Sequence, residues 1–302
     1  MEKILVTGAN GLVGKSLVRL LLQKGYAVIA VGKGPCRLNL EHAALTYYAA
    51  DITHPFEMQL ILEKEQPAVV VHGAAMTQAD DCELKQNEAH VCNVEATARL
   101  LMDAEAFSGF FVFLSTDFVF DGEKGMYNET DSESPISWYG STKLEAEALV
   151  QTAEMPWAIV RTCLVYGPAT EQGRSNIYSW VKDSLQQQKP IKVVDDQWRT
   201  PTWVEDLAGG LLLVIRQRAA GTWHLSGPDY TTPYQMALSI ARYYGFDERL
   251  ISRVTAATFS QPAKRPLRTG FDISKARQAL GYDPGSFDKN LPVIDSQLFS
   301  GR

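Results

Sequence analysis

The sequence predicts an α/β protein with a doubly wound parallel sheet, followed by a smaller α/β lobe towards the C-terminus. Three observations carry this prediction. Short β-branched runs alternate with helix-length segments through the first half of the 302-residue chain. These runs are apolar throughout, which is typical of strands that helices cover on both faces. A glycine-rich turn directly follows the first run and precedes a helix-length segment.

The expected elements follow from this alternation. Amphipathic or helix-length stretches separate the runs, notably at residues 11–25 and 88–107, so successive strand–helix units are indicated. The expected strands cover residues 3–7, 27–31, 45–49, 68–72, 110–115 and 158–162. After Gly167 and Pro168 the alternation of strand-like and helix-length segments becomes irregular. We therefore expect a first domain over residues 1–166 and a lobe over 167–302, with a segment near 195–227 returning to the main domain.

The composition limits the classes of partner that this protein is expected to bind. The net charge of −6 opposes attraction to nucleic acid or to an anionic membrane, so a small-molecule partner is expected. No apolar run approaches the roughly 20 residues of a membrane span, and the start has no secretory signal, which predicts a cytoplasmic protein. The five histidines and four cysteines have no metal-ligand spacing, so no metal site is expected and the cysteines are interpreted as buried thiols.

The glycine-rich turn predicts a nucleotide site. Gly8 suits a tight turn, Gly11 a close backbone approach to a pyrophosphate, and Gly14 close packing of helix on strand. The N-terminus of the following helix would then stabilise the phosphates through its free N–H groups and its dipole. In this context the first domain is interpreted as a Rossmann-type NAD(P)-binding domain.

The end of the second strand indicates which dinucleotide binds. An NAD enzyme is expected to have a carboxylate there for the adenosine ribose, but this chain has Lys33 and Arg37. Because cations attract a 2′-phosphate, NADP(H) is favoured, with NAD(H) as the alternative; the two cations could also be solvated loop charges. Asp51 and Ile52, after the third strand, are expected to approach the adenine ring.

Tyr139 and Lys143 lie one helical turn apart in YGSTK, so both side chains can face one site. An ammonium group beside a phenol favours the phenolate and so makes the tyrosine a better proton donor near neutral pH. Ser115 and Thr116 end the fifth strand at the carboxyl edge of the sheet, where ligands bind in this architecture. One of these hydroxyls is expected to orient a substrate carbonyl. Asp117 is either an acceptor for a substrate hydroxyl or a turn residue.

Several motifs together carry a resemblance to a known family. They are TGANGLVG at 7–14, HGAAMTQADDCE at 72–83, Asn93, STDFVFDG at 115–122, SPISWYGSTKLEAE at 134–147, RTCLVYG at 161–167, DQWRTPT at 196–202 and KRPLRTGFD at 264–272. With these motifs the chain resembles the extended short-chain dehydrogenase/reductase superfamily, and within it the dTDP-4-dehydrorhamnose reductase family. The likeness covers nearly the whole chain.

The resemblance implies roles for individual residues. Thr116 matches the carbonyl-orienting residue, Tyr139 the general acid and Lys143 the lysine that lowers its pKa, while Asn93 matches an asparagine that supports this lysine through water. The implied reaction is reduction of a nucleotide-linked 4-keto-6-deoxy sugar by NADPH, in a protein that could form a homodimer. Cofactor contacts are implied for Gly8, Asn10, Gly11, Leu12, Val13, Gly14, Lys33, Asp51, Ile52, Ala74, Ala75, Asn93, Tyr139 and Lys143, and substrate contacts for Asp117, Phe118, Val119, Arg199 and Arg265.

Two departures from the family pattern concern the sugar. Leu164 stands where a tryptophan is common, and Arg199 stands where small residues are frequent and would suit a diphosphate or an acidic sugar. The chain also resembles the NADP-binding β subunit of methionine adenosyltransferase, which makes a regulatory module the alternative to an enzyme. Another sugar-nucleotide epimerase or reductase of the superfamily is a third reading. Retention of Thr116, Tyr139 and Lys143 favours the enzyme.

Overall fold

The computed structural model describes residues 1–54, 56–168 and 175–300, with side chains to residue 296. A seven-stranded sheet has the order β10-β6-β5-β4-β1-β2-β3, and every neighbouring pair is parallel. Its strands are β1 (Lys3–Thr7), β2 (Ala27–Gly32), β3 (Leu45–Ala49), β4 (Val69–His72), β5 (Phe111–Thr116), β6 (Trp157–Thr162) and β10 (Gly221–His224). The predicted fold class is confirmed.

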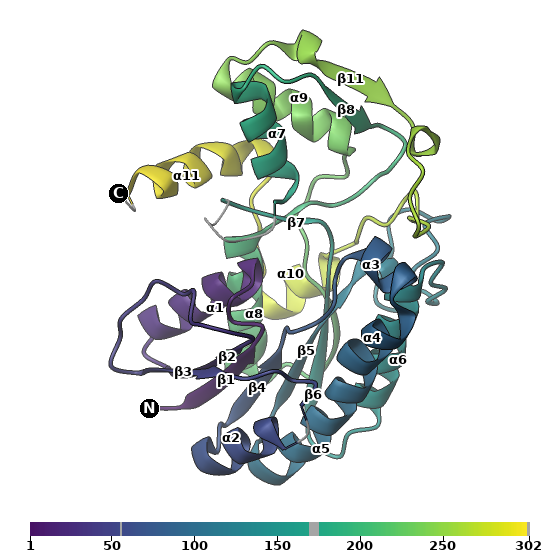
Figure 1. Cartoon of the computed structure of the whole chain (residues 1–302). Helices are drawn as coiled ribbons and strands as arrows, with labels where there is room; N and C mark the ends of the chain where they lie inside the picture. The colour runs from purple at the N-terminus through teal and green to yellow at the C-terminus, as the bar shows by residue number, and fades with distance from the viewer. Residues whose placement is uncertain (55, 169–174, 301–302) are drawn as a thin grey trace.

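Helices cover both faces of this sheet (Figure 1). One face packs in a core with α1 (Leu12–Gln23), α8 (Val204–Gln217) and α10 (Ser274–Leu280). The other face packs with α2 (Glu57–Glu65), α5 (Ala96–Phe107) and α6 (Trp138–Gln151). Burial on two faces explains why β1, β4 and β5 are apolar along nearly their whole length.

The expected helix over 88–107 has a more detailed form. It comprises α4 (Gln86–His90), a π-helical turn at Val91–Glu95 and α5, and α3 (Ala79–Leu84) precedes it. Single π-helical turns inside α-helices frequently occur at functional sites. The turn contains Asn93, which the sequence had singled out.

A second lobe lies beyond one end of the main sheet (Figure 1). It contains α7 (Ile177–Gln186), α9 (Pro233–Tyr244), α11 (Phe287–Ser300) and a parallel pair of strands, β8 (Ile191–Val194) and β11 (Ile251–Val254). A short pair, β7 (Val165–Tyr166) with β9 (Thr202–Trp203), lies between the lobe and the sheet. The chain passes back to the main domain at α8 and β10, and again at α10.

Among the described residues none of the four cysteines forms a disulfide. Cys82 and Cys163 are buried, as expected, but Cys36 is exposed and Cys92 is only half-buried. The prediction was wrong for Cys36 because it lies in the loop after β2, which the sheet core does not cover.

Candidate active site

The glycine-rich turn connects β1 to α1. Gly8 has a φ of +71°, and a Cβ there would lie 2.9 Å from the backbone of Gly73. A Cβ on Gly14 would lie 2.3 Å from the Gly8 carbonyl oxygen, so α1 packs against the turn at a distance that only glycine allows. Gly11 is the N-cap of α1 and has no side chain to occupy the first-turn N–H groups, which include those of Leu12 and Val13. The turn therefore has the form of an anion cradle.

Asn10 fixes the loop that carries the two predicted cations. Its side-chain amide donates to the Pro35 carbonyl at 3.1 Å and to the Tyr47 hydroxyl at 2.8 Å, and its oxygen accepts from the Arg37 N–H at 2.9 Å. Lys33 is largely exposed, and its ammonium lies 2.8 Å from the Asp51 carboxylate. The loop after β2 therefore holds Lys33 and Arg37 beside the glycine-rich turn.

A buried histidine joins the ends of β1 and β4. The Thr97 hydroxyl donates to the Asn93 carbonyl and accepts from His72 Nε2 at 3.0 Å. His72 Nδ1 is then an acceptor for the Thr7 hydroxyl at 2.7 Å, and Thr7 in turn accepts from the N–H groups of Gly73 and Ala74. Burial lowers the pKa of His72 to about 3, so the ring stays neutral and this arrangement is fixed.

Ala74 and Ala75 lie in the irregular segment between β4 and α3, which also contains Met76. Asn93 holds Met76: its Oδ1 accepts from the Met76 N–H at 2.8 Å, and its Nδ2 donates to the Met76 carbonyl and to Thr142 Oγ1, each at 3.0 Å. The resemblance implied that Asn93 reaches Lys143 through water. The side-chain amide of Asn93 binds the backbone after β4 and Thr142, the neighbour of Lys143, and the water-mediated contact stays a prediction.

Tyr139 and Lys143 lie on the first two turns of α6, which Ser137 caps by accepting from the Gly140 N–H at 3.2 Å. Both side chains are buried, and the Lys143 ammonium lies 3.8 Å from the centroid of the Phe113 ring on β5. Burial lowers the pKa of Lys143 to about 7, which the negative charge of Glu147 opposes. Burial raises the pKa of Tyr139 well above its usual value, which a hydrogen bond with Thr116 opposes.

The predicted hydroxyl pair ends β5. Thr116 lies beside Tyr139, donates to Asp117 Oδ1 at 3.1 Å and accepts from the Phe118 N–H at 3.2 Å. The Phe118 ring packs edge-on against Tyr139 with the centroids 5.6 Å apart. Ser115 is buried, and its hydroxyl has no hydrogen-bond partner among the described residues. Thr116, Tyr139 and Phe118 are thus brought together from β5, α6 and the turn after β5.

The remaining predicted substrate residues, Val119, Arg199 and Arg265, contact other parts of the chain. Val119 is fully buried in the core of the main domain. Arg199 is also buried, and its guanidinium donates to backbone carbonyls at 198, 266 and 267. Arg265 forms a bidentate pair with Asp80 on α3, at 2.8 and 3.1 Å.

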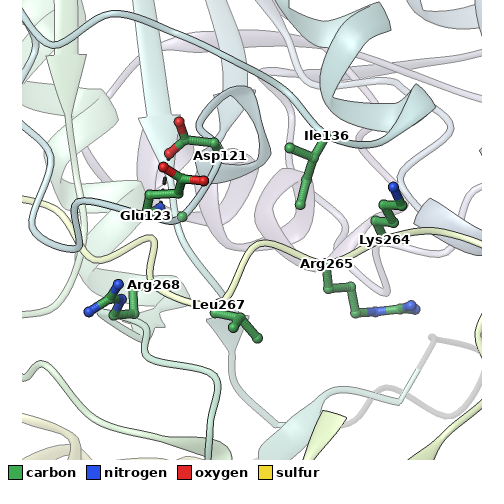
Figure 2. Close-up of a pocket in the computed structure, with 8 residues that line it drawn as sticks. Asp121, Glu123, Ile136, Lys264, Arg265, Leu267 and Arg268 are labelled. Carbon is green, nitrogen blue, oxygen red and sulfur yellow. Dashed lines mark hydrogen bonds between the residues drawn. The ribbon is translucent and has the colours of Figure 1, made fainter. Parts of the chain in front are cut away.

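An open hollow of about 520 Å³ lies beside these residues, and Figure 2 shows the side chains that line it. Cations and carboxylates both contribute to it, and it lies between the loop at 121–123 and the segment at 264–268. Its lining residues are Asp121, Gly122, Glu123, Ile136, Lys264, Arg265, Leu267 and Arg268.

Sequence reasoning did not find the partners that hold the site. Thr269 donates a short hydrogen bond to Asp117 from 152 positions away, and no local pattern signals such a contact. The ion pair of Glu147 with Arg161, close to Lys143, was also not predicted. Glu147 continues the four-residue spacing of Tyr139 and Lys143 along α6, which is a signal that could have indicated it. In the parts of the chain that the structure describes, no cluster of metal-ligating side chains occurs and no helix could cross a membrane.

Comparison with known proteins agrees with this architecture. The family of the RmlD substrate binding domain matches residues 1–298. The dTDP-4-dehydrorhamnose reductase of Aggregatibacter actinomycetemcomitans is 31% identical over 314 residues, which cover 97% of this chain and 98% of that protein. The methionine adenosyltransferase 2 subunit beta of Pongo abelii is 30% identical over 281 residues, or 91% of this chain and 81% of that protein. The structure of a dTDP-4-dehydrorhamnose reductase from Bacillus anthracis in complex with NADP has a TM-score of 0.86 at 25% identity, and covers 98% of this chain and 99% of its own.

Proposed function

Because this chain belongs to the family of the RmlD substrate binding domain, we propose that it is an NADPH-dependent reductase of a nucleotide-linked 4-keto-6-deoxy sugar, with NADH as the alternative donor. The observation that supports the proposal is the interaction of Thr116 with Tyr139 at the carboxyl edge of the sheet, with Lys143 buried one turn further along the same helix. The glycine-rich turn at the end of β1 lies at the same edge. A pyridine nucleotide bound there supplies the hydride.

The residues of the turn fit a dinucleotide. The α1 N-terminus offers N–H groups without a side-chain cap, and Lys33 and Arg37 provide charge for a 2′-phosphate. Asp51 and Ile52 follow β3 at the same edge of the sheet, where the adenine is expected.

The proton chemistry follows from burial. Burial raises the pKa of Tyr139, contrary to the lowering expected from Lys143, so Tyr139 keeps its proton and can give it to the oxyanion formed at C4 of the sugar. Thr116 is placed to orient the carbonyl beside it. Lys143, with its pKa near neutrality, provides a positive charge that stabilises the phenolate left behind.

Two observations favour the reductase over the regulatory subunit. This chain spans 98% of the bacterial reductase but 81% of the methionine adenosyltransferase subunit, so the reductase matches over more of its own length. The three catalytic side chains are also retained, which a pure binding module does not require. The homodimer and the cytoplasmic location stay predictions, which light scattering and cell fractionation would test.

The test follows NADPH oxidation with a panel of nucleotide-linked 4-keto-6-deoxy sugars. Tyr139→Phe should keep NADPH affinity and lose turnover by about 10²-fold or more, because it lacks the acidic proton. Tyr243→Phe, a tyrosine on the exposed end of α9, is the matched control and should behave as wild type. If wild type consumes NADPH with none of these sugars, the regulatory reading replaces the reductase.

A further inference from the structure

Asp117 is a buried carboxylate whose two oxygens serve different segments of the chain. Oδ1 accepts from the Thr116 hydroxyl at 3.1 Å. Oδ2 accepts a short hydrogen bond from Thr269 and lies 3.6 Å from Arg199 Nε. The side chains of Thr116, Asp117, Arg199 and Thr269 are all at most 7% exposed. Asp117 therefore links the catalytic end of β5 to two segments near the second lobe.

Arg199 uses its other donors to hold those segments together. Its Nη1 donates to the carbonyls of Trp198 and Leu267 at 2.8 and 3.1 Å, and its Nη2 to the carbonyl of Pro266 at 2.6 Å. The backbones are joined as well, since the Trp198 N–H donates to the Leu267 carbonyl and the Thr269 N–H to the Trp198 carbonyl. The segment at 264–268 is the one that lines the hollow in Figure 2.

We propose that Arg199 and Thr269 act through Asp117 as positioning residues for the Thr116 hydroxyl. The proposal rests on the proposed function, in which Thr116 orients the substrate carbonyl. With Asp117 held by two partners on Oδ2, its Oδ1 holds the Thr116 side chain in one rotamer, beside the Phe118 N–H and Tyr139. From that position the Thr116 hydroxyl can turn its proton from Asp117 to the substrate carbonyl. On this proposal Arg199 does not bind the sugar diphosphate.

Few charged or titratable groups surround Asp117 and Tyr139. Asp117 faces Arg199, Thr269, Thr116 and the buried Cys163 thiol. Tyr139 is influenced by Thr116, by Asp117 and by Cys82 on α3, while Lys143 lies one turn along its own helix. The negative charge of Asp117 raises the pKa of Tyr139. Removing the charge and removing only the hydrogen bond should therefore have different signatures.

The first experiment compares Thr269→Val with Thr200→Val. Thr200 is a buried neighbour of Arg199 that accepts from the Phe271 N–H and has no described contact with Asp117, so it is the matched control. Thr269→Val should lower kcat about tenfold, the effect of losing one hydrogen bond to a charged group, with KM and NADPH affinity within about twofold of wild type. Thr269→Ser should restore kcat, and Thr200→Val should leave it unchanged.

The second experiment follows ionisation of Tyr139 by ultraviolet absorbance titration, taken as the difference between each protein and its Tyr139→Phe counterpart. Asp117→Asn removes the negative charge, so the pKa of Tyr139 should fall and the phenolate should form at lower pH than in wild type. Thr269→Val keeps the charge and should leave this titration unchanged. A merely structural role for Asp117 would leave the titration unchanged in both variants.

Two kinetic results and one structural result would overturn the proposal. One is a raised KM with unchanged kcat in Arg199→Met, because that pattern means that Arg199 contacts the substrate in the ground state. The other is full activity of Thr269→Val. If wild type reduces no keto sugar, the proposed function fails separately, and a crystal structure of Arg199→Met still decides the positioning. There the distance from Thr116 Oγ1 to Asp117 Oδ1 should exceed its present 3.1 Å, and an unchanged distance would refute the inference.

Discussion

Glu147→Gln tests the buried charge network beside Lys143, the lysine proposed to stabilise the phenolate. Glu147 is fully buried on α6, and Arg161 on β6 is 1% exposed. Arg161 Nε donates to both Glu147 oxygens at 3.0 and 3.2 Å, and its Nη2 donates to Oε2 at 2.5 Å. Arg161 also pairs with Glu133, which is partly exposed.

The expected loss follows from these contacts. Removing one partner of a buried ion pair costs about 3–5 kcal/mol. Because Glu133 remains and the glutamine oxygen can still accept one hydrogen bond, we expect the lower end, about 3 kcal/mol of unfolding free energy. Urea denaturation followed by circular dichroism measures this loss. Glu145→Gln is the control on the same helix, since Glu145 is exposed and an exposed pair contributes at most about 1 kcal/mol.

The same substitution should change the pH dependence of turnover. The charge of Glu147 raises the pKa of Lys143, so Glu147→Gln should lower it further below its value of about 7. Lys143 acts in its protonated form, and the loss of kcat should therefore be greater at pH 8 than at pH 6. Equal stability losses for Glu147→Gln and Glu145→Gln, or a pH-independent effect on kcat, would refute this reasoning.

Three further predictions concern single features of the site. Burial holds the pKa of Lys143 at about 7 against a usual 10.5, so the folded state binds fewer protons than the unfolded state in that window and unfolding free energy should rise with pH. Lys143→Met should remove that rise, which urea denaturation at pH 7 and pH 10 would show. Changing Lys33 and Arg37 together to Ala should weaken NADPH much more than NADH, and equal weakening in a fluorescence titration would contradict the 2′-phosphate assignment. Gly11→Val should fold, because a Cβ there meets only the Gly8 oxygen at 3.2 Å, yet lose both nucleotides; normal binding would exclude the pyrophosphate from this turn.

Local patterns predicted much of the site. The glycine spacing anticipated the contact of Gly14 with the turn, and the four-residue spacing anticipated that Tyr139 and Lys143 share a helix face. Thr116 was expected beside them because strands of a parallel sheet end at a common edge. These placements were predictable because each depends on neighbours in sequence or on the regular geometry of one sheet.

The partners of Arg199 could not be predicted in this way. Its cationic side chain in a turn-rich segment suggested a diphosphate, whereas the folded chain surrounds it with carbonyls and Asp117. Asn93 likewise binds Met76 and Thr142, since the π-helical turn and the segment after β4 meet only in three dimensions.

The sequence by itself determined the sheet, the glycine-rich turn and the family, because buried strands, glycine turns and helical spacing follow from contacts between near neighbours. The tertiary structure decided how the segments at Arg199 and Thr269 meet Asp117 beside Thr116. Segments near residues 117, 199 and 269 are far apart in the chain, and burial away from water requires their charges and polar groups to find partners in one another.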